Sequence, residues 1–220
     1  IVFGMLGILN ITKKELITWT DIGAAFAGLG SILSVIIILP SKIAEHLFEK
    51  IKEDQKLNID ELDLEKEDIK PLTKALLDKR DGLLADGRMD DEMFRYARQF
   101  AAADEIVIAA PFWDLSFPAL VKDYIENVNV CGVTFMYKEK GERVGLCNAK
   151  HLVYITTAGG PIFSDEFGYG YIRSLCEMLY GIPETCCIKA EGLDIYGADV
   201  EGIMAEAYRD AENVYVAKSI

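Results

Sequence analysis

The chain has 220 residues, 51% of them hydrophobic, and a formal net charge of −13. This length and apolar content suit one α/β domain with a sizeable core and something extra attached. A protein that binds nucleic-acid phosphates needs clustered Lys and Arg, and this acidic sequence has no such cluster, so nucleic acid is not an expected partner. The five cysteines contain no CxxC pair. We therefore expect no metal site and no disulfide framework, and a cytoplasmic location.

The first 40 residues form the most apolar part of the chain. Residues 22–39 contain no charged side chain and follow an earlier apolar run at residues 1–9. By its length the later run could span a bilayer. Its β-branched stretch leads directly into a helical pattern, which favours instead a buried first strand at residues 32–39. Residues 1–30 keep three interpretations: a membrane hairpin, an added hydrophobic element or foreign sequence.

From residue 41 onward, helical patterns alternate with short apolar runs, which is typical of βαβ units and a parallel α/β sheet. The next predicted strands are residues 58–64, near a sheet edge, then 105–110, 152–157 and 185–190. The predicted helices are residues 41–56, a polar segment from Pro71 to about Gly82, and residues 90–103, 118–128, 171–180 and 200–217.

The loop after the strand at residues 105–110 is the first candidate site, because ligands of an open parallel sheet bind beyond the carboxyl ends of its strands. This loop reads PFWDLSF and contains Phe112 and Trp113. Large aromatic side chains on a surface loop are costly unless something flat covers them. The loop is therefore a candidate surface for a planar ligand.

Two further loops carry residues of interest. The run TTAGGP at residues 156–161 contains Gly159 and Gly160, which let the backbone approach a ligand and offer N–H donors. The run VCGVTFMY at residues 130–137 brings Phe135 and Tyr137 after a predicted helix. Each loop alone is a weak signal, and their joint placement in one sheet is a stronger one.

Four motifs together give a specific resemblance. They are PFWDLSFPALVKDYIE at residues 111–126, GVTFMY at 132–137, ITTAGG at 155–160 and AEG at 190–192. From residue 41 to the end, the sequence resembles the family of FMN-dependent NADH azoreductases and NAD(P)H:quinone oxidoreductases. The resemblance implies a flavodoxin-like, doubly wound parallel sheet with helices on both faces, forming an FMN-binding domain over residues 31–220.

The resemblance also implies a set of site residues. The FMN contacts would be Ser41, Pro111, Phe112, Trp113, Asp114, Leu115, Thr157, Ala158, Gly159 and Gly160. The substrate pocket would contain Trp113, Phe135 and Tyr137, with the tyrosine commonly contributed across a homodimer interface. No residue of the chain needs to act as an acid or base.

The implied activity is a two-electron, ping-pong transfer from NADH or NADPH, through FMN, to a quinone or an azo compound at the same site. Two positions depart from the family pattern. Asp114 stands where members often carry Asn, and we expect only its backbone to contact the flavin. Residues 38–41 run directly into a helix, so the usual phosphate loop is shortened and weak FMN binding is expected. The alternative is a flavodoxin-like binding module with a degenerate cofactor site, tethered to a membrane through residues 1–39.

Overall fold

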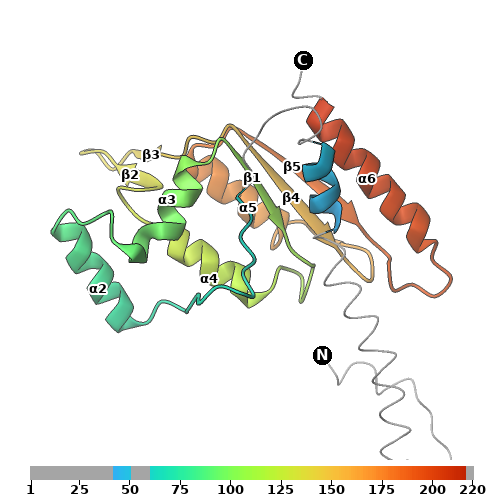
Figure 1. Ribbon diagram of the computed structural model, residues 1–220, viewed down its shortest axis with the longest axis horizontal. Helices are drawn as coiled ribbons and strands as arrows, with labels where there is room; N and C mark the ends of the chain where they lie inside the picture. The colour runs from blue at the N-terminus through green and yellow to red at the C-terminus, as the bar shows by residue number, and fades with distance from the viewer. Residues whose placement is uncertain (1–41, 51–59, 217–220) are drawn as a thin grey trace, which may run out of the picture. The chain divides into compact units, whose positions relative to one another are not determined.

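The computed structural model of the chain describes residues 42–50 and 60–216. Residues 42–50 are helical, and the labelled elements follow as in Figure 1. The helices are α2 (Lys74–Ala85), α3 (Arg95–Ala102), α4 (Ala119–Val128), α5 (Tyr169–Leu175) and α6 (Val200–Val216), with a 3₁₀ turn at Glu92–Phe94 and a π-helical turn at Cys176–Tyr180. The strands are β1 (Glu105–Ala109), β2 (Phe135–Tyr137), β3 (Arg143–Gly145), β4 (His151–Thr157) and β5 (Glu184–Ala190).

Strand β4 is the middle strand of a parallel sheet in the order β1, β4, β5. Its register places Leu152 between Ile106 of β1 and Thr185 of β5. Every residue of β4 after His151 is buried. Because successive side chains of a strand point to opposite faces, burial of all of them requires apolar cover on both faces of the sheet.

That cover comes from helices on both faces, as Figure 1 shows. One face, with Leu152 and Tyr154 of β4, packs against side chains of α3, α4 and α5, namely Tyr96, Phe100, Val121, Ile125 and Ile172. The other face, with Val153 and Ile155, packs against the helix at 42–50 and α6 through Ile43, Ala44, Leu47, Met204, Ala207 and Ala211. The predicted doubly wound α/β architecture is confirmed.

The antiparallel pair β2 and β3 forms a hairpin outside this sheet. The hairpin is held by a close approach of two glycines, because a Cβ atom on Gly145 would lie 2.2 Å from the backbone nitrogen of Gly181 and from the carbonyl of Tyr180. Gly181 has a φ of 74° and ends the π-helical turn just before β5. The hairpin therefore lies at the amino end of β5, away from the carboxyl edge of the sheet (Figure 1).

Most predicted elements match the structure within a few residues, and one does not. Residues 60–64 of the predicted strand at 58–64 form no strand. Leu62 and Leu64 instead pack onto the core from an irregular segment, which Glu67 anchors by an ion pair to Arg95. One-sided packing of an extended loop produces the same alternation of apolar and acidic residues as an edge strand. The predicted first strand at 32–39 lies outside the described residues.

The hypothesis of a membrane segment concerned residues 1–39, which also lie outside the described part. Within residues 42–50 and 60–216, no helix is both long enough and apolar enough to cross a bilayer.

The buried thiols predict a loss of stability in alkaline solution. All five cysteines are free, and burial raises the pKa of Cys147, Cys176 and Cys187 from about 9 to about 12. A raised pKa in the folded state contributes stability that is complete below about pH 9 and is lost as the pH rises towards 12. Each thiol should lower the free energy of unfolding by roughly 1 kcal/mol at about pH 10. Urea denaturation should show a smaller alkaline loss for Cys187→Ala, and an unchanged loss would contradict the assignment.

Candidate functional site

The loops after β1 and β4 lie side by side because their strands are neighbours in the sheet. The N–H of Phe112 donates to the carbonyl of Thr157 over 2.9 Å, and the N–H of Ala158 donates to Ala190 over 2.9 Å. These hydrogen bonds continue the strand ladder beyond the carboxyl ends of β1 and β4. The predicted contacts Pro111 and Phe112 therefore lie beside Thr157 and Ala158 at one edge of the sheet.

The loop after β1 contains a strained two-residue turn. Trp113 and Ser116 exchange both N–H···O=C hydrogen bonds, at 2.8 and 2.7 Å. Between them, Asp114 has a φ of 49° and Leu115 a φ of 68°, the left-handed pattern of a type I′ turn. For a leucine this conformation costs about 1–2 kcal/mol. The Ser116 hydroxyl donates to the carbonyl of Phe167 over 2.6 Å and ties the turn to the loop after β4.

Replacing Leu115 should separate stability from activity. Leu115→Gly relieves the left-handed strain, and after the entropy cost of glycine the protein should be stabilised by up to about 1 kcal/mol. Leu115→Val should destabilise it by about 1–2 kcal/mol, since a β-branched residue tolerates positive φ least. Thermal denaturation should therefore rank Gly above Leu above Val, while turnover falls in both variants. Equal melting temperatures across the series would show that the turn stores no strain.

Side chains and backbone of the two loops are left free to contact a ligand. Leu115 is 60% exposed and Trp113 is 37% exposed. Several N–H groups of the two loops find no acceptor among the described residues, and those of Asp114, Leu115, Gly159 and Gly160 are among them. Buried or covered N–H groups are nearly always paired, so a ligand that covers this surface has to supply acceptors.

The two adjacent glycines have different surroundings. A Cβ atom on Gly159 would lie 2.9 Å from the Cβ of Asp194, whose N–H donates to the Gly159 carbonyl over 2.9 Å. A Cβ atom on Gly160 would meet nothing within 4 Å. Gly159 is therefore confined by the segment after β5, whereas the space beside Gly160 is open.

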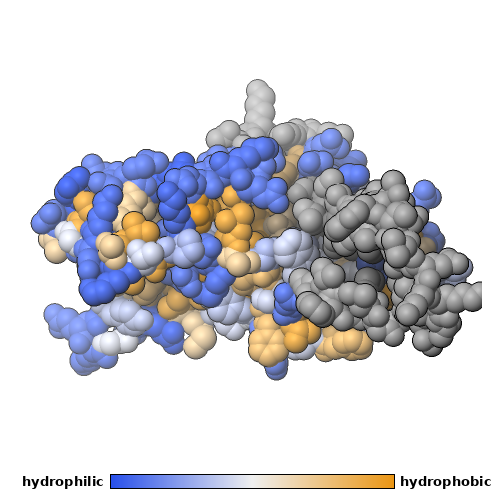
Figure 2. Space-filling view, turned by 90° about the horizontal axis from the view of Figure 1, so that it is seen from below, coloured by the Kyte–Doolittle hydropathy of each residue, from blue (hydrophilic) through white to orange (hydrophobic). Residues whose placement is uncertain are grey.

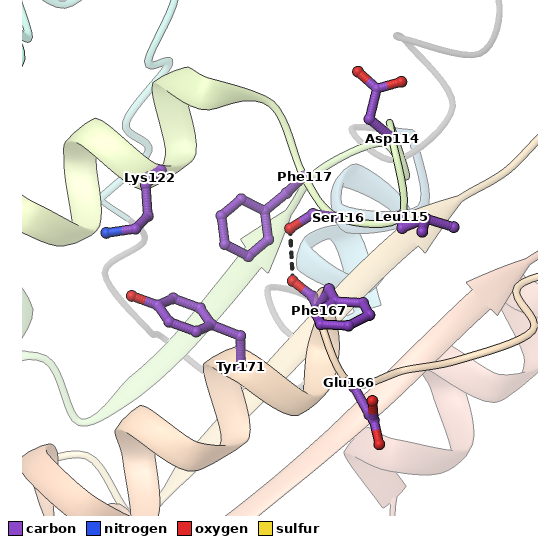
Figure 3. Close-up of a pocket in the computed structure, with 8 residues that line it drawn as sticks. All are labelled: Asp114, Leu115, Ser116, Phe117, Lys122, Glu166, Phe167 and Tyr171. Atoms are coloured by element: carbon purple, nitrogen blue, oxygen red, sulfur yellow. Dashed lines mark hydrogen bonds between the residues drawn. The ribbon is translucent and has the colours of Figure 1, made fainter.

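A pocket of about 580 Å³ extends from the strained turn towards α4 and α5, as Figure 3 shows. Its lining residues are Asp114, Leu115, Ser116, Phe117, Lys122, Glu166, Phe167 and Tyr171. Burial alone would lower the pKa of Lys122, but its 2.6 Å hydrogen bond to Glu126 and its interactions with Tyr171 together outweigh burial and raise the pKa. The pocket is thus lined by four aromatic or aliphatic side chains and four polar or charged ones, among them the Lys122 ammonium, which is charged at neutral pH.

Two predicted site residues do not join this group within one chain. Phe135 and Tyr137 belong to the hairpin at the amino end of the sheet, where Tyr137 is 53% exposed. They do not share a pocket with Trp113 unless a second copy of the chain brings its hairpin there. Ser41 lies outside the described residues.

The sequence reasoning missed Phe167, Tyr171, Lys122 and Glu166. Phe167 could have been identified from the sequence, because residues 161–168 read PIFSDEFG and place two phenylalanines in a loop after a buried strand. This is the same signal that identified PFWDLSF. Figure 2, in which hydrophobic residues are orange, shows such residues reaching the surface among hydrophilic ones. The most exposed phenylalanine, Phe163, has 89% of its surface accessible.

Comparisons with known proteins agree with this architecture. The model of a family described as "Flavodoxin-like fold" matches residues 39–215. An FMN-dependent NADH:quinone oxidoreductase of Clostridium acetobutylicum is 42% identical over 178 residues, which cover 78% of this chain and 87% of that protein. A protein of the same name from Coprothermobacter proteolyticus is 36% identical, with 79% of this chain and 88% of the relative covered.

A solved structure gives the same fold. The FMN complex of an FMN-dependent NADH-azoreductase from Bacillus anthracis superposes with a TM-score of 0.70 at 23% identity, over 83% of this chain and 92% of that one. The family model and the sequence relatives span most of the chain. The chain therefore belongs to the family of flavodoxin-like FMN-dependent NADH:quinone oxidoreductases.

Proposed function

We propose that the chain is an FMN-dependent NAD(P)H:quinone oxidoreductase that also accepts azo compounds, with its flavin between the loops after β1 and β4. One observation carries the proposal: both loops at the carboxyl edge of the sheet have unpaired N–H donors, and one of the loops carries the exposed Trp113. The family relationship supplies the chemistry that such a surface would serve.

The residues present fit a flavin. The edge of the isoalloxazine ring carries carbonyl and nitrogen acceptors, which suit the N–H groups of Asp114, Leu115, Gly159 and Gly160. Its apolar faces suit Trp113 and Leu115. FMN, when bound, supplies the redox chemistry, and the protein supplies position and electrostatics. We propose that the start of the helix at 42–50 binds the FMN phosphate, with Ser41 as the contact residue.

The chain's own part is to orient the ring and exclude water. The type I′ turn leaves the N–H groups of Asp114 and Leu115 unpaired, and the two hydrogen bonds between Trp113 and Ser116 hold the turn in this conformation before the flavin arrives. The carboxylate of Asp114 points away from the pocket in Figure 3, which agrees with a role for its backbone alone. Donor and acceptor then use one flavin face in succession, which gives ping-pong kinetics.

We further propose a homodimer in which the partner's hairpin completes the substrate pocket with its phenylalanine and tyrosine. The support is that Tyr137 is exposed on a hairpin at the far end of the sheet from Trp113. A monomer in analytical ultracentrifugation at assay concentration would exclude this arrangement. Free cysteines suit a cytoplasmic enzyme. We retain residues 31–220 as the extent of the flavodoxin-like domain.

The experiment measures reduction of the protein by NADH and its reoxidation by a quinone as two separate reactions in the absence of oxygen. NADH should bleach the visible absorption of the FMN-loaded protein, and menadione should restore it in a second step. Steady-state double-reciprocal plots should be parallel. A protein that binds no FMN, or a flavin that NADH leaves oxidised, would refute the proposed function, and intersecting lines would refute the shared site.

A further inference from the structure

The loop at residues 161–168, between β4 and α5, carries two exposed phenylalanines, of which one lines the pocket. Phe167 lines the pocket in Figure 3 and is 56% exposed, and Phe163 is 89% exposed. Exposed phenylalanines on a loop gain nothing from the core, so their position has to be set by the backbone that carries them. The contacts of that backbone therefore decide the shape of one pocket wall.

Two side chains at the end of β5 hold this loop. The Lys189 ammonium contacts Asp165 over 2.6 Å and Glu191 over 3.9 Å. Glu191 in turn accepts a hydrogen bond from the N–H of Ile162 over 3.1 Å. The register pairs Lys189 with Thr156 of β4, so the clamp sits at the carboxyl edge of the sheet. Lys189, Glu191 and Asp165 together form what we call the β5 clamp.

The charges of the β5 clamp stabilise one another. Burial alone would lower the pKa of Lys189, but the hydrogen bond and charge of Asp165 outweigh it, so the pKa is raised and the ammonium stays charged throughout the neutral range. The side chains of Lys189 and Asp165 are 29% and 47% exposed, which keeps the ion pair weak. Such a pair positions a loop without being essential for the fold.

The segment between the clamp and α5 has little freedom. The N–H of Gly170 donates to the carbonyl of Asp165 over 2.6 Å, and a Cβ atom on Gly170 would lie 2.7 Å from that oxygen. Phe167 is further tied through its carbonyl to the Ser116 hydroxyl. Movement of Asp165 is thereby transmitted to Phe167 and to the pocket wall opposite the turn.

We infer that Lys189 is a positioning residue that sets acceptor specificity, because its ion pair with Asp165 holds the loop bearing Phe163 and Phe167 against the pocket. This inference rests on the proposed quinone reductase activity for its kinetic consequence. Acceptors large enough to contact the phenylalanines depend on the clamp. Single-ring acceptors that reach only the flavin do not.

The test compares variants of the FMN-loaded protein with menadione and with p-benzoquinone. Lys189→Met and Asp165→Asn should each raise the KM for menadione about three- to fivefold, the upper part of the range expected for loss of one partly exposed ion pair. Both kcat values, the KM for p-benzoquinone and the FMN content should stay within about twofold of the parent. Lys189→Arg should behave as the parent. The matched control is Lys74→Met, which breaks the exposed pair with Asp78 in α2 and should change nothing.

Hydrogen exchange of the same variants gives a readout that needs no turnover. Amides of residues 162–168 should exchange faster than in the parent in Lys189→Met and Asp165→Asn. Their exchange rates should be unchanged in Lys74→Met. A parent protein without quinone reductase activity would refute the proposed function. In that case the exchange rates of residues 162–168 alone would test whether Lys189 and Asp165 hold the loop in place. Unaltered exchange, or an equal rise in KM for both acceptors, would overturn the inference.

Discussion

Gly145→Ala is expected to destabilise the protein by about 3–5 kcal/mol, the largest effect of any single methyl group that we identify. The new Cβ would lie 2.2 Å from backbone atoms of Tyr180 and Gly181, and no side-chain rotation relieves a clash with backbone. The hairpin would have to separate from the turn before β5, losing the hydrogen bond from the Cys147 N–H to the Tyr180 carbonyl. Because domains are stable by only about 5–15 kcal/mol, this is a large share.

Chemical denaturation measures this effect, and Gly82→Ala is its control. Gly82 lies in α2 with nothing within 4 Å of an added Cβ, so alanine there should be neutral or stabilise by up to about 1 kcal/mol. If the hairpin reaches a partner's pocket, Gly145→Ala should also weaken dimerisation. A Gly145→Ala protein within 1 kcal/mol of the parent, about the effect of an ordinary surface change, would show that the close approach is wrong.

Gly160→Val is expected to weaken FMN binding at least tenfold, about 1.4 kcal/mol, while changing apo stability by less than about 1 kcal/mol. A Cβ atom at this position meets nothing within 4 Å, so we expect the fold to tolerate valine, but the side chain enters the space through which the loop would approach the flavin. FMN titration by flavin fluorescence, paired with thermal unfolding of the apo protein, measures both quantities.

Gly159→Ala is the matched comparison at the neighbouring position. Its Cβ would press on Asp194, so this variant should lose stability, by about 1–2 kcal/mol, more than it loses FMN affinity. Sequence alone suggests that both glycines serve the ligand in the same way. If instead Gly160→Val leaves the FMN dissociation constant unchanged, the loop after β4 does not approach the flavin.

Elements whose signals are local were predictable from sequence. The run EIVIAA and the buried run of β4 are continuous apolar stretches of strand length, and Gly181 marks the end of a helix where the chain needs a positive φ. The order of these elements was sufficient to predict that the loops after β1 and β4 share an edge of the sheet. The third loop predicted to lie with them, at residues 130–137, instead leads into the hairpin outside the sheet.

Features that depend on distant parts of the chain were not predictable. The contact of Gly145 with Gly181 joins positions 36 residues apart, and the residues next to each glycine give no indication of this contact. The left-handed turn was hidden because Asp114 and Leu115 replace the Asn-Gly pair that normally marks a type I′ turn. The ion pair of Lys189 with Asp165 depends on tertiary folding of a loop that has no regular period.

The location of the flavin is the central claim, and amide hydrogen exchange with and without FMN tests it most directly. We expect FMN to protect the N–H groups of Asp114, Leu115, Gly159 and Gly160, because these donors lie just beyond the carboxyl ends of β1 and β4 and have no acceptor among the described residues. The strand amides of β1 and β4 should change little. Protection confined to other segments, such as the open pocket along the hairpin at Met136–Glu142, with these four amides unchanged, would contradict the proposed site.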